Sequence, residues 1–119
     1  MEFFDELIED SNSEKMREIG VFGYEETPRT FLHIESGDIR LSVQASCVHY
    51  CHPRITSMYL EDYSSMEFAM IKGDSFTSVE EIFPDSDLQE KLEPYFDGTV
   101  YGFVPVKLIN KLYLALKGD

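Results

Sequence analysis

Both cysteines and two of the three histidines of this chain lie in one short segment, residues 47–52. Thiolate sulfur and imidazole nitrogen are preferred ligands of zinc, and a thiolate beside an imidazole is a common nucleophile–base pair. The segment therefore contains a candidate nucleophile, Cys51, and a set of candidate metal ligands: Cys47, His49, Cys51 and His52.

The spacing around this segment matches neither kind of site. Structural zinc sites usually join a close cysteine pair to a second ligand pair far away in the sequence, and Cys47 and Cys51 form such a first pair only if the backbone turns between them. Pro53 follows the segment, where a nucleophile would need a glycine-rich turn or a helix start to build an oxyanion site. We expect no metal, no cofactor and no enzymatic activity. A Cys/His-dependent enzyme or metal-binding protein remains an open alternative, beside the simpler one of buried thiols and a hydrogen-bonded histidine.

The strand that leads into the segment determines which side chains are accessible. In residues 41–47, apolar side chains alternate with polar ones, and this period of two is typical of a half-buried strand. If the alternation continues, the exposed side chains beside Pro53 are Tyr50, His52 and Arg54. A ring, an imidazole and a guanidinium together can stack on and pair with a nucleotide-like or carboxylate ligand, so these three are predicted binding residues. The competing interpretation is structural, with Arg54 paired to a carboxylate and Tyr50 covering the sheet edge.

Charge is the strongest global property of the chain. The sequence has 23 acidic and 10 basic residues, a net charge of −13. Nucleic-acid-binding proteins carry basic patches, so DNA and RNA are poor partners, and an acidic field favours a basic partner protein instead. The simpler explanation of the negative charge is that it keeps the protein soluble. The acids concentrate in residues 2–18 and 74–97, and those expected to carry the field are Glu2, Glu6, Glu9, Asp10, Glu80, Glu81, Asp85, Asp87 and Glu90.

Length and composition predict one domain over residues 1–119. No apolar run reaches 18 residues, and the acidic N-terminus does not resemble a secretory signal. Two cysteines do not form a disulfide framework, so we expect free thiols in a reducing cytoplasm. We expect no contact with a membrane, and the formation of a homo-oligomer remains an alternative.

The pattern of the chain predicts an α+β fold, an antiparallel sheet of four to six strands with the terminal helices packed on one face. Strands are expected at residues 30–35, 38–46, 55–60, 65–72 and 100–104, and residues 19–23 are an edge strand or a turn. The first hairpin turns at Ser36-Gly37, which places Leu32 opposite Leu41. A first helix is expected at residues 3–10 and is ended by residues 11–13. Two short helices are expected after the capping boxes that begin at Ser78 and Ser86, and a last helix from Pro105 to Gly118. The predicted core is Leu32, Ile34, Leu41, Val43, Phe68, Ile109, Leu112 and Leu116.

Two segments, His49-Tyr50-Cys51-His52-Pro53-Arg54 and Val100-Tyr101-Gly102-Phe103-Val104-Pro105-Val106, resemble a pattern in small uncharacterised proteins of phages and prophages. The resemblance implies a context and no residue roles: an acidic accessory protein, in the host cytoplasm, that acts against host functions. It favours a non-enzymatic, anti-CRISPR-like or other anti-defence inhibitor that binds a nucleic-acid-binding or defence protein through a DNA-mimic-like acidic surface. The alternative is an oligomeric module that sequesters a nucleotide-like metabolite through Tyr50, His52 and Arg54.

Overall fold

The computed structural model describes residues 1–20 and 23–118. It has the predicted α+β fold, an open antiparallel sheet of five strands with four α-helices. The strands are β1 (Ile34–Ser36), β2 (Ile39–Gln44), β3 (Ser65–Lys72), β4 (Ser75–Thr77) and β5 (Tyr101–Pro105). The α-helices are α1 (Ser11–Ile19), α2 (Val79–Ile82), α3 (Asp87–Leu92) and α4 (Val106–Leu116); short 3-10 helices are η1 (Glu2–Glu6), η2 (Tyr24–Glu26), η3 (Leu60–Asp62) and η4 (Glu93–Tyr95).

Strand β3 is the centre of the sheet, as its apolar residues on both faces predict. It pairs with β2 along one side, and with β4 and β5 at different ends of the other side. Both tight hairpins, β1–β2 and β3–β4, turn on a Gly-Asp pair whose glycine, Gly37 or Gly73, has φ 63°. Glycine adopts this left-handed conformation without steric cost, so the two turns fix the registers of their strands.

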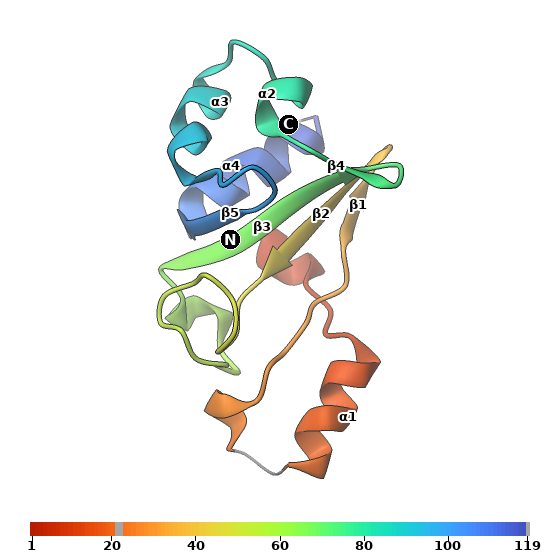
Figure 1. The fold of residues 1–119 in the computed structure, drawn as a ribbon, viewed down its shortest axis with the longest axis vertical. Coiled ribbons are helices and arrows are strands. Elements are labelled where there is room, and N and C mark those ends of the chain that lie inside the picture. Colours follow the sequence, from red (N-terminus) through yellow and green to blue (C-terminus); the bar gives the residue numbers. More distant parts are fainter. Residues whose placement is uncertain (21–22, 119) are drawn as a thin grey trace.

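The molecule is elongated, with extents of 47 × 25 × 25 Å. Helix α1 lies at one end of the long axis, α2 and α3 lie at the other, and the sheet runs between them (Figure 1). Helix α4 contacts α3, β3, β5 and η1, so the two terminal segments pack together. Within the described residues, no helix combines the length and hydrophobicity needed to cross a membrane.

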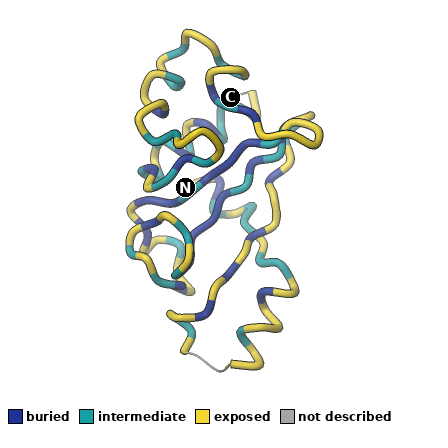
Figure 2. Tube along the Cα trace, viewed as in Figure 1, coloured by how far each residue is buried: buried dark blue, intermediate teal, exposed yellow. Residues whose placement is uncertain are grey.

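The hydrophobic core lies between the sheet and α4, where buried positions follow the central strands (Figure 2). Phe68 on β3 stacks on Tyr101 on β5 with ring centroids 4.3 Å apart, and Ile109 and Leu112 of α4 are fully buried. The predicted core is confirmed for Ile34, Leu41, Val43, Phe68, Ile109 and Leu112, whereas Leu116 is only partly buried. Leu32 is 50 % exposed, so its assignment to the core was wrong.

Leu32 leaves the core because the first hairpin pairs two residues away from the predicted register. The observed partners are Ile34 with Leu41 and Ser36 with Ile39, because Gly37-Asp38 forms the turn. A shift of two residues preserves the face of every side chain, so Ile34 and Leu41 still point into the core. Leu32 then lies before the strand begins.

The predicted helix over residues 3–10 was wrong in its bounds. The chain forms the 3-10 helix η1 at residues 2–6, and the α-helix begins at Ser11, where polar residues had suggested a break. Asp10 is the N-cap, because its side chain accepts the Asn12 N–H, and Ser13 donates to Glu9. Short polar residues favour helix N-termini as much as turns, which explains the error. Val21 and Phe22, from the apolar run predicted as a strand or turn, lie outside the described residues.

The expected strand at residues 55–60 is also absent from the described residues, and a backbone carbonyl of this segment accepts from a buried arginine instead. Arg29 is 4 % exposed and donates to Ser57 O, Ala45 O and the Tyr63 hydroxyl. Its guanidinium also lies 4.6 Å from the centre of the Phe31 ring. No carboxylate among the described residues forms an ion pair with it. The side chain therefore joins three segments that are distant in sequence.

The outer edge of the sheet beside β1 is covered by other parts of the chain. The Gln44 side-chain amide donates to Phe31 O and accepts the Phe31 N–H, at 2.9 and 2.8 Å. Residues 8–10 pair with residues 30–32 on the far side of that segment. The Lys117 ammonium donates to Glu35 O on β1 itself. Side chains and neighbouring segments thus occupy hydrogen-bonding positions that a sheet edge usually exposes.

Candidate functional site

The Cys/His segment folds into a turn that buries its thiol. Strand β2 ends at Gln44, and the chain then turns, with the Cys51 N–H donating to His49 O. The Cys51 Sγ donates to Ser46 O at 3.3 Å, and burial raises the pKa of this thiol. A buried thiol with a raised pKa is a poor nucleophile, so Cys51 is a structural residue in this fold.

A serine–histidine pair, which the sequence analysis did not single out, lies beside this thiol. Ser46 Oγ lies 2.7 Å from His49 Nδ1, but Ser46 is completely buried. Burial lowers the pKa of His49, and the charges of Arg29 and Arg54 lower it further. The Ser46 hydroxyl is therefore inaccessible to a substrate, and its contact with the partly buried His49 holds the turn. Among the described residues, no group of three or more His, Cys, Asp or Glu side chains is placed to hold a metal ion.

The structure brings two of the three predicted binding residues together. Tyr50, His52 and Arg54 are all exposed, and the Arg54 guanidinium lies 5.2 Å from the centre of the Tyr50 ring. His52 instead contributes its backbone, pairing with Ser64 and Ser65 beside β3. Tyr50 and Arg54 therefore form a stacked pair, and His52 is not part of the hollow next to it.

The hollow beside Tyr50 is an open groove of about 510 Å³, which we call the aromatic groove. The Tyr50 and Phe103 rings lie 5.7 Å apart, and these side chains are 44 % and 50 % exposed. Exposed aromatic side chains gathered in one hollow are typical of binding surfaces. The residues that line the groove are Tyr50, Pro94, Tyr95, Asp97, Gly102 and Phe103.

A bulge in β5 turns Phe103 toward this groove. Between the pairs Met66–Val104 and Phe68–Tyr101, one residue of β3, Glu67, faces two residues of β5, Gly102 and Phe103. Phe103 has φ 55°, a conformation that is rare for a bulky side chain and costs about 1–3 kcal/mol. Bulges often redirect a side chain next to a functional site.

Contacts with Tyr50 hold this conformation in place. The Phe103 N–H donates to Tyr50 O at 2.9 Å. A Cβ on Gly102 would lie 3.1 Å from the Tyr50 Cβ, so glycine permits the approach of the two segments. The sequence analysis did not identify Phe103 or Asp97 as site residues. A glycine between aromatic residues in a short strand is the signal that could have identified the bulge.

Two carboxylates give the groove a negative field. Asp97 lines the groove, and its carboxylate accepts hydrogen bonds from two backbone N–H groups. The bond from the Thr99 N–H, and after it the bond from the Val100 N–H, lowers the pKa of Asp97. Burial raises the pKa of Glu67, whose carboxylate accepts the Tyr50 N–H at 3.3 Å, and the charge of Asp97 raises it further. Asp97 is thus a fixed, ionised group, and the half-buried Glu67 supports the backbone of Tyr50.

Glu67→Gln should raise the stability of the protein near neutral pH and leave it unchanged in acid. The raised pKa means that the folded state holds the Glu67 proton more tightly than the unfolded state, whose pKa lies near 4.5. Below that pH both states are protonated; as the pH rises through the folded pKa, the stability contributed by this proton is lost. Glutamine keeps an acceptor for the Tyr50 N–H and carries no charge. Thermal unfolding of both proteins at about pH 4 and about pH 7 measures the difference, and an equal difference at both pH values would contradict the assignment.

Several of the acids predicted to form a contact surface have structural partners instead. Glu2 accepts from Asn110, Glu6 accepts from Tyr113 and Glu9 pairs with Arg17. Together with Asp10, the cap of α1, they stabilise the N-terminal region. At the other end of the molecule, Glu81 accepts from Thr77 and Asp87 pairs with Lys91. The predicted acids left exposed without such a contact among the described residues are Glu80, Asp85 and Glu90.

These remaining acids lie at the α2–α3 end of the molecule, opposite α1 (Figure 1). Helix α3 leads directly into η4, whose Pro94 and Tyr95 line the aromatic groove. Exposed Glu93 and Asp97 belong to this same stretch. The free acidic surface of residues 80–97 is therefore continuous in the chain with the wall of the groove.

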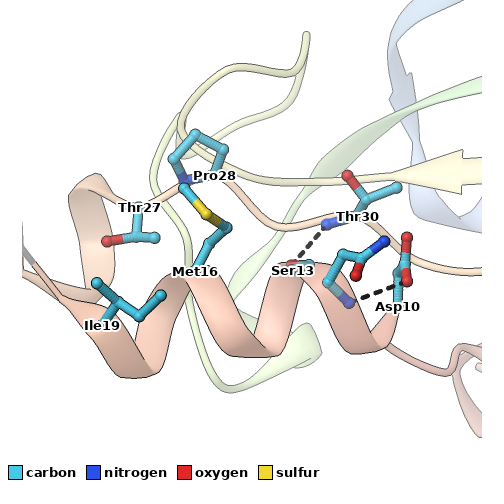
Figure 3. A pocket seen from close by; sticks show the side chains of 8 residues that line it. Asp10, Ser13, Met16, Ile19, Thr27, Pro28 and Thr30 are labelled. Atoms are coloured by element: carbon cyan, nitrogen blue, oxygen red, sulfur yellow. Dashed lines mark hydrogen bonds between the residues drawn. The ribbon is translucent and has the colours of Figure 1, made fainter.

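A second hollow, of about 380 Å³, lies between α1 and residues 27–30. Met16 and Ile19 project from α1 toward Thr27 and Pro28, and Ser13 Oγ accepts the Thr30 N–H at one end (Figure 3). Its surface is mainly apolar, and its one carboxylate among the described lining residues is that of Asp10, which accepts the Asn12 N–H as the cap of α1. None of the described residues that line it is aromatic, so it offers no ring on which a ligand could stack.

No protein-family model matches this chain, and no curated protein or solved structure is significantly similar to it. The chemistry of the described residues is therefore the basis on which a function is proposed.

Proposed function

We propose that this chain is a non-enzymatic inhibitor that binds a basic, nucleic-acid-binding partner protein. The aromatic groove is the anchor of the contact, and the exposed acids of residues 80–97 are its charged rim. An accessory protein of a phage acting on a host protein is the context that the sequence resemblance favours. The observation that carries the proposal is the strained, half-exposed Phe103, with φ 55°, beside the half-exposed Tyr50.

The combination of rings and acids suits a protein partner. A few aromatic residues near the centre of an interface provide most of the binding energy, and charged residues around them set orientation and association rate. The acidic rim matches the Lys/Arg surface with which a nucleic-acid-binding protein holds phosphates. Carboxylates placed on that surface would exclude the nucleic acid from the partner.

A small anionic ligand fits the groove less well. A nucleotide brings phosphates, and Asp97 in the groove wall would repel them. Arg54, which stacks on Tyr50, is a single positive charge against the carboxylates of Asp97 and Glu67. The nucleotide-sequestering alternative therefore has weaker support than the basic partner protein.

Phe103→Gly should abolish partner binding and leave the fold intact. Glycine adopts a positive φ without strain, so the gain in backbone conformation offsets the lost ring contacts and the stability should change by less than about 1 kcal/mol. Phe76→Gly is the matched control, because Phe76 is also exposed but lies on β4 with an ordinary φ. This control should lose about 1 kcal/mol and keep its binding. If Phe103→Gly unfolds, or if it stays folded and binds the partner as well as wild type does, Phe103 is a structural residue and the proposal fails.

The partner is identified by comparing what wild type and Phe103→Gly retain from a bacterial lysate, and the retained protein is then purified. Its affinity should fall steeply between about 0.05 and about 0.5 M NaCl, and duplex DNA or RNA should compete for it. An acidic partner, or an affinity that does not change with salt, would overturn the proposed function.

A further inference from the structure

The composition of the aromatic groove indicates which part of a basic partner it would hold. Three rings and a proline line it, and Asp97 lines it with an ionised carboxylate. Ring faces and a carboxylate attract cations, and the same surface repels anions. A purely apolar side chain would contact the rings of the groove and leave the Asp97 carboxylate unused, whereas a cation can contact both.

The groove also favours a guanidinium over an ammonium ion. A guanidinium is planar, so it can stack on a ring face while its edge pairs with a carboxylate; an ammonium ion is compact and strongly hydrated. The chain contains an example at this place, because the Arg54 guanidinium lies 5.2 Å from the centre of the Tyr50 ring. Tyr50 therefore presents a ring that accepts guanidinium stacking.

We propose that the aromatic groove binds the side chain of an arginine from the partner, with the Tyr50, Tyr95 and Phe103 rings around the guanidinium and the Asp97 carboxylate paired to it. This inference rests on the proposed function for the source of the arginine. The site itself is defined by the chain's own residues, so it can be tested without the partner.

The test is a titration of residues 1–119, monitored by NMR, with three short peptides that are identical except at one central position. That position holds arginine, lysine or citrulline, which has nearly the shape of arginine but no charge. The arginine peptide should shift the resonances of Tyr50, Tyr95, Gly102 and Phe103. The lysine peptide should bind several-fold more weakly, and the citrulline peptide about tenfold more weakly or not at all.

Two variants, each with a control, connect the binding to the groove. Asp97→Asn keeps an acceptor for the Thr99 and Val100 N–H groups and removes the charge, so arginine-peptide affinity should fall about tenfold. Glu61→Gln removes one charge from exposed η3 and should leave the affinity unchanged within about twofold. Phe103→Gly should lose the arginine peptide, and Phe76→Gly should retain it.

The outcomes separate this inference from the proposed function. Equal binding of the arginine and citrulline peptides, or arginine-induced shifts outside the groove, would overturn the arginine site even if a basic partner binds with salt dependence. Groove shifts that require arginine and Asp97 would establish the site even if the partner from the lysate proves to be neutral or acidic. A preference for the lysine peptide would also overturn the guanidinium assignment.

Discussion

Replacing Arg29 by methionine is expected to lower the free energy of unfolding by about 3–5 kcal/mol. The side chain is buried and donates to two backbone carbonyls, Ser57 O and Ala45 O, neither of which accepts another hydrogen bond from the described residues. Methionine fills much of the volume but leaves both carbonyls unsatisfied in the interior. This loss outweighs the gain from removing a desolvated charge, because the unmet acceptors remain buried.

Chemical denaturation of Arg29→Met and of a matched control, Arg40→Met, measures this effect. Arg40 is less buried and donates one bond, to Gly73 O, so its replacement should cost less than about 1.5 kcal/mol. Arg29→Lys keeps the charge but has fewer hydrogen-bond donors, so its loss of stability should lie between those of Arg29→Met and Arg40→Met. This variant provides the comparison if Arg29→Met does not fold. If Arg29→Met is no more destabilising than Arg40→Met, the guanidinium does not hold the three segments together.

Leu41→Ala is expected to cost about 2–5 kcal/mol, and Leu32→Ala less than about 0.5 kcal/mol. The two leucines were predicted to face each other across the first hairpin, but Leu41 is 1 % exposed and Leu32 is 50 % exposed. The same chemical change thus removes packed side-chain volume at one position and mostly solvated volume at the other. Denaturant unfolding of the two variants compares them directly, and equal costs would show that the register with Ile34 opposite Leu41 is wrong.

The parts of the fold that depend on neighbouring residues could be predicted from the sequence. The Ser78 and Ser86 caps accept the N–H groups of Glu81 and Gln89 as expected, because a capping box acts over three residues. Helix α4 begins immediately after Pro105, as predicted from the same kind of local signal. The exposure of Tyr50 and Arg54 also followed from a local pattern, although β2 ends at Gln44 and a turn produces that exposure.

The parts that depend on distant segments could not be predicted. Arg29 had no local signal of burial, because its acceptors lie 16 and 28 residues away along the chain. The groove forms where the turn at Tyr50 meets the bulge at Gly102–Phe103, and neither segment contains a sequence signal of its contact with the other. The prediction of an acidic surface from composition could not distinguish carboxylates with internal partners, such as Glu9, from those that remain free.

The covered sheet edges beside β1 and β5 restrict how another protein can be recognised there. The amide of Gln44 takes the place of a peptide group beside Phe31, and on the opposite side of the sheet Tyr50 O accepts the Phe103 N–H of β5. A partner that binds by adding its own strand needs a row of unpaired backbone groups, and these contacts occupy such positions. At these two edges, affinity must then come from side chains rather than from main-chain pairing. Where binding depends on a few side-chain contacts, a single substitution in a partner protein is enough to create or remove recognition.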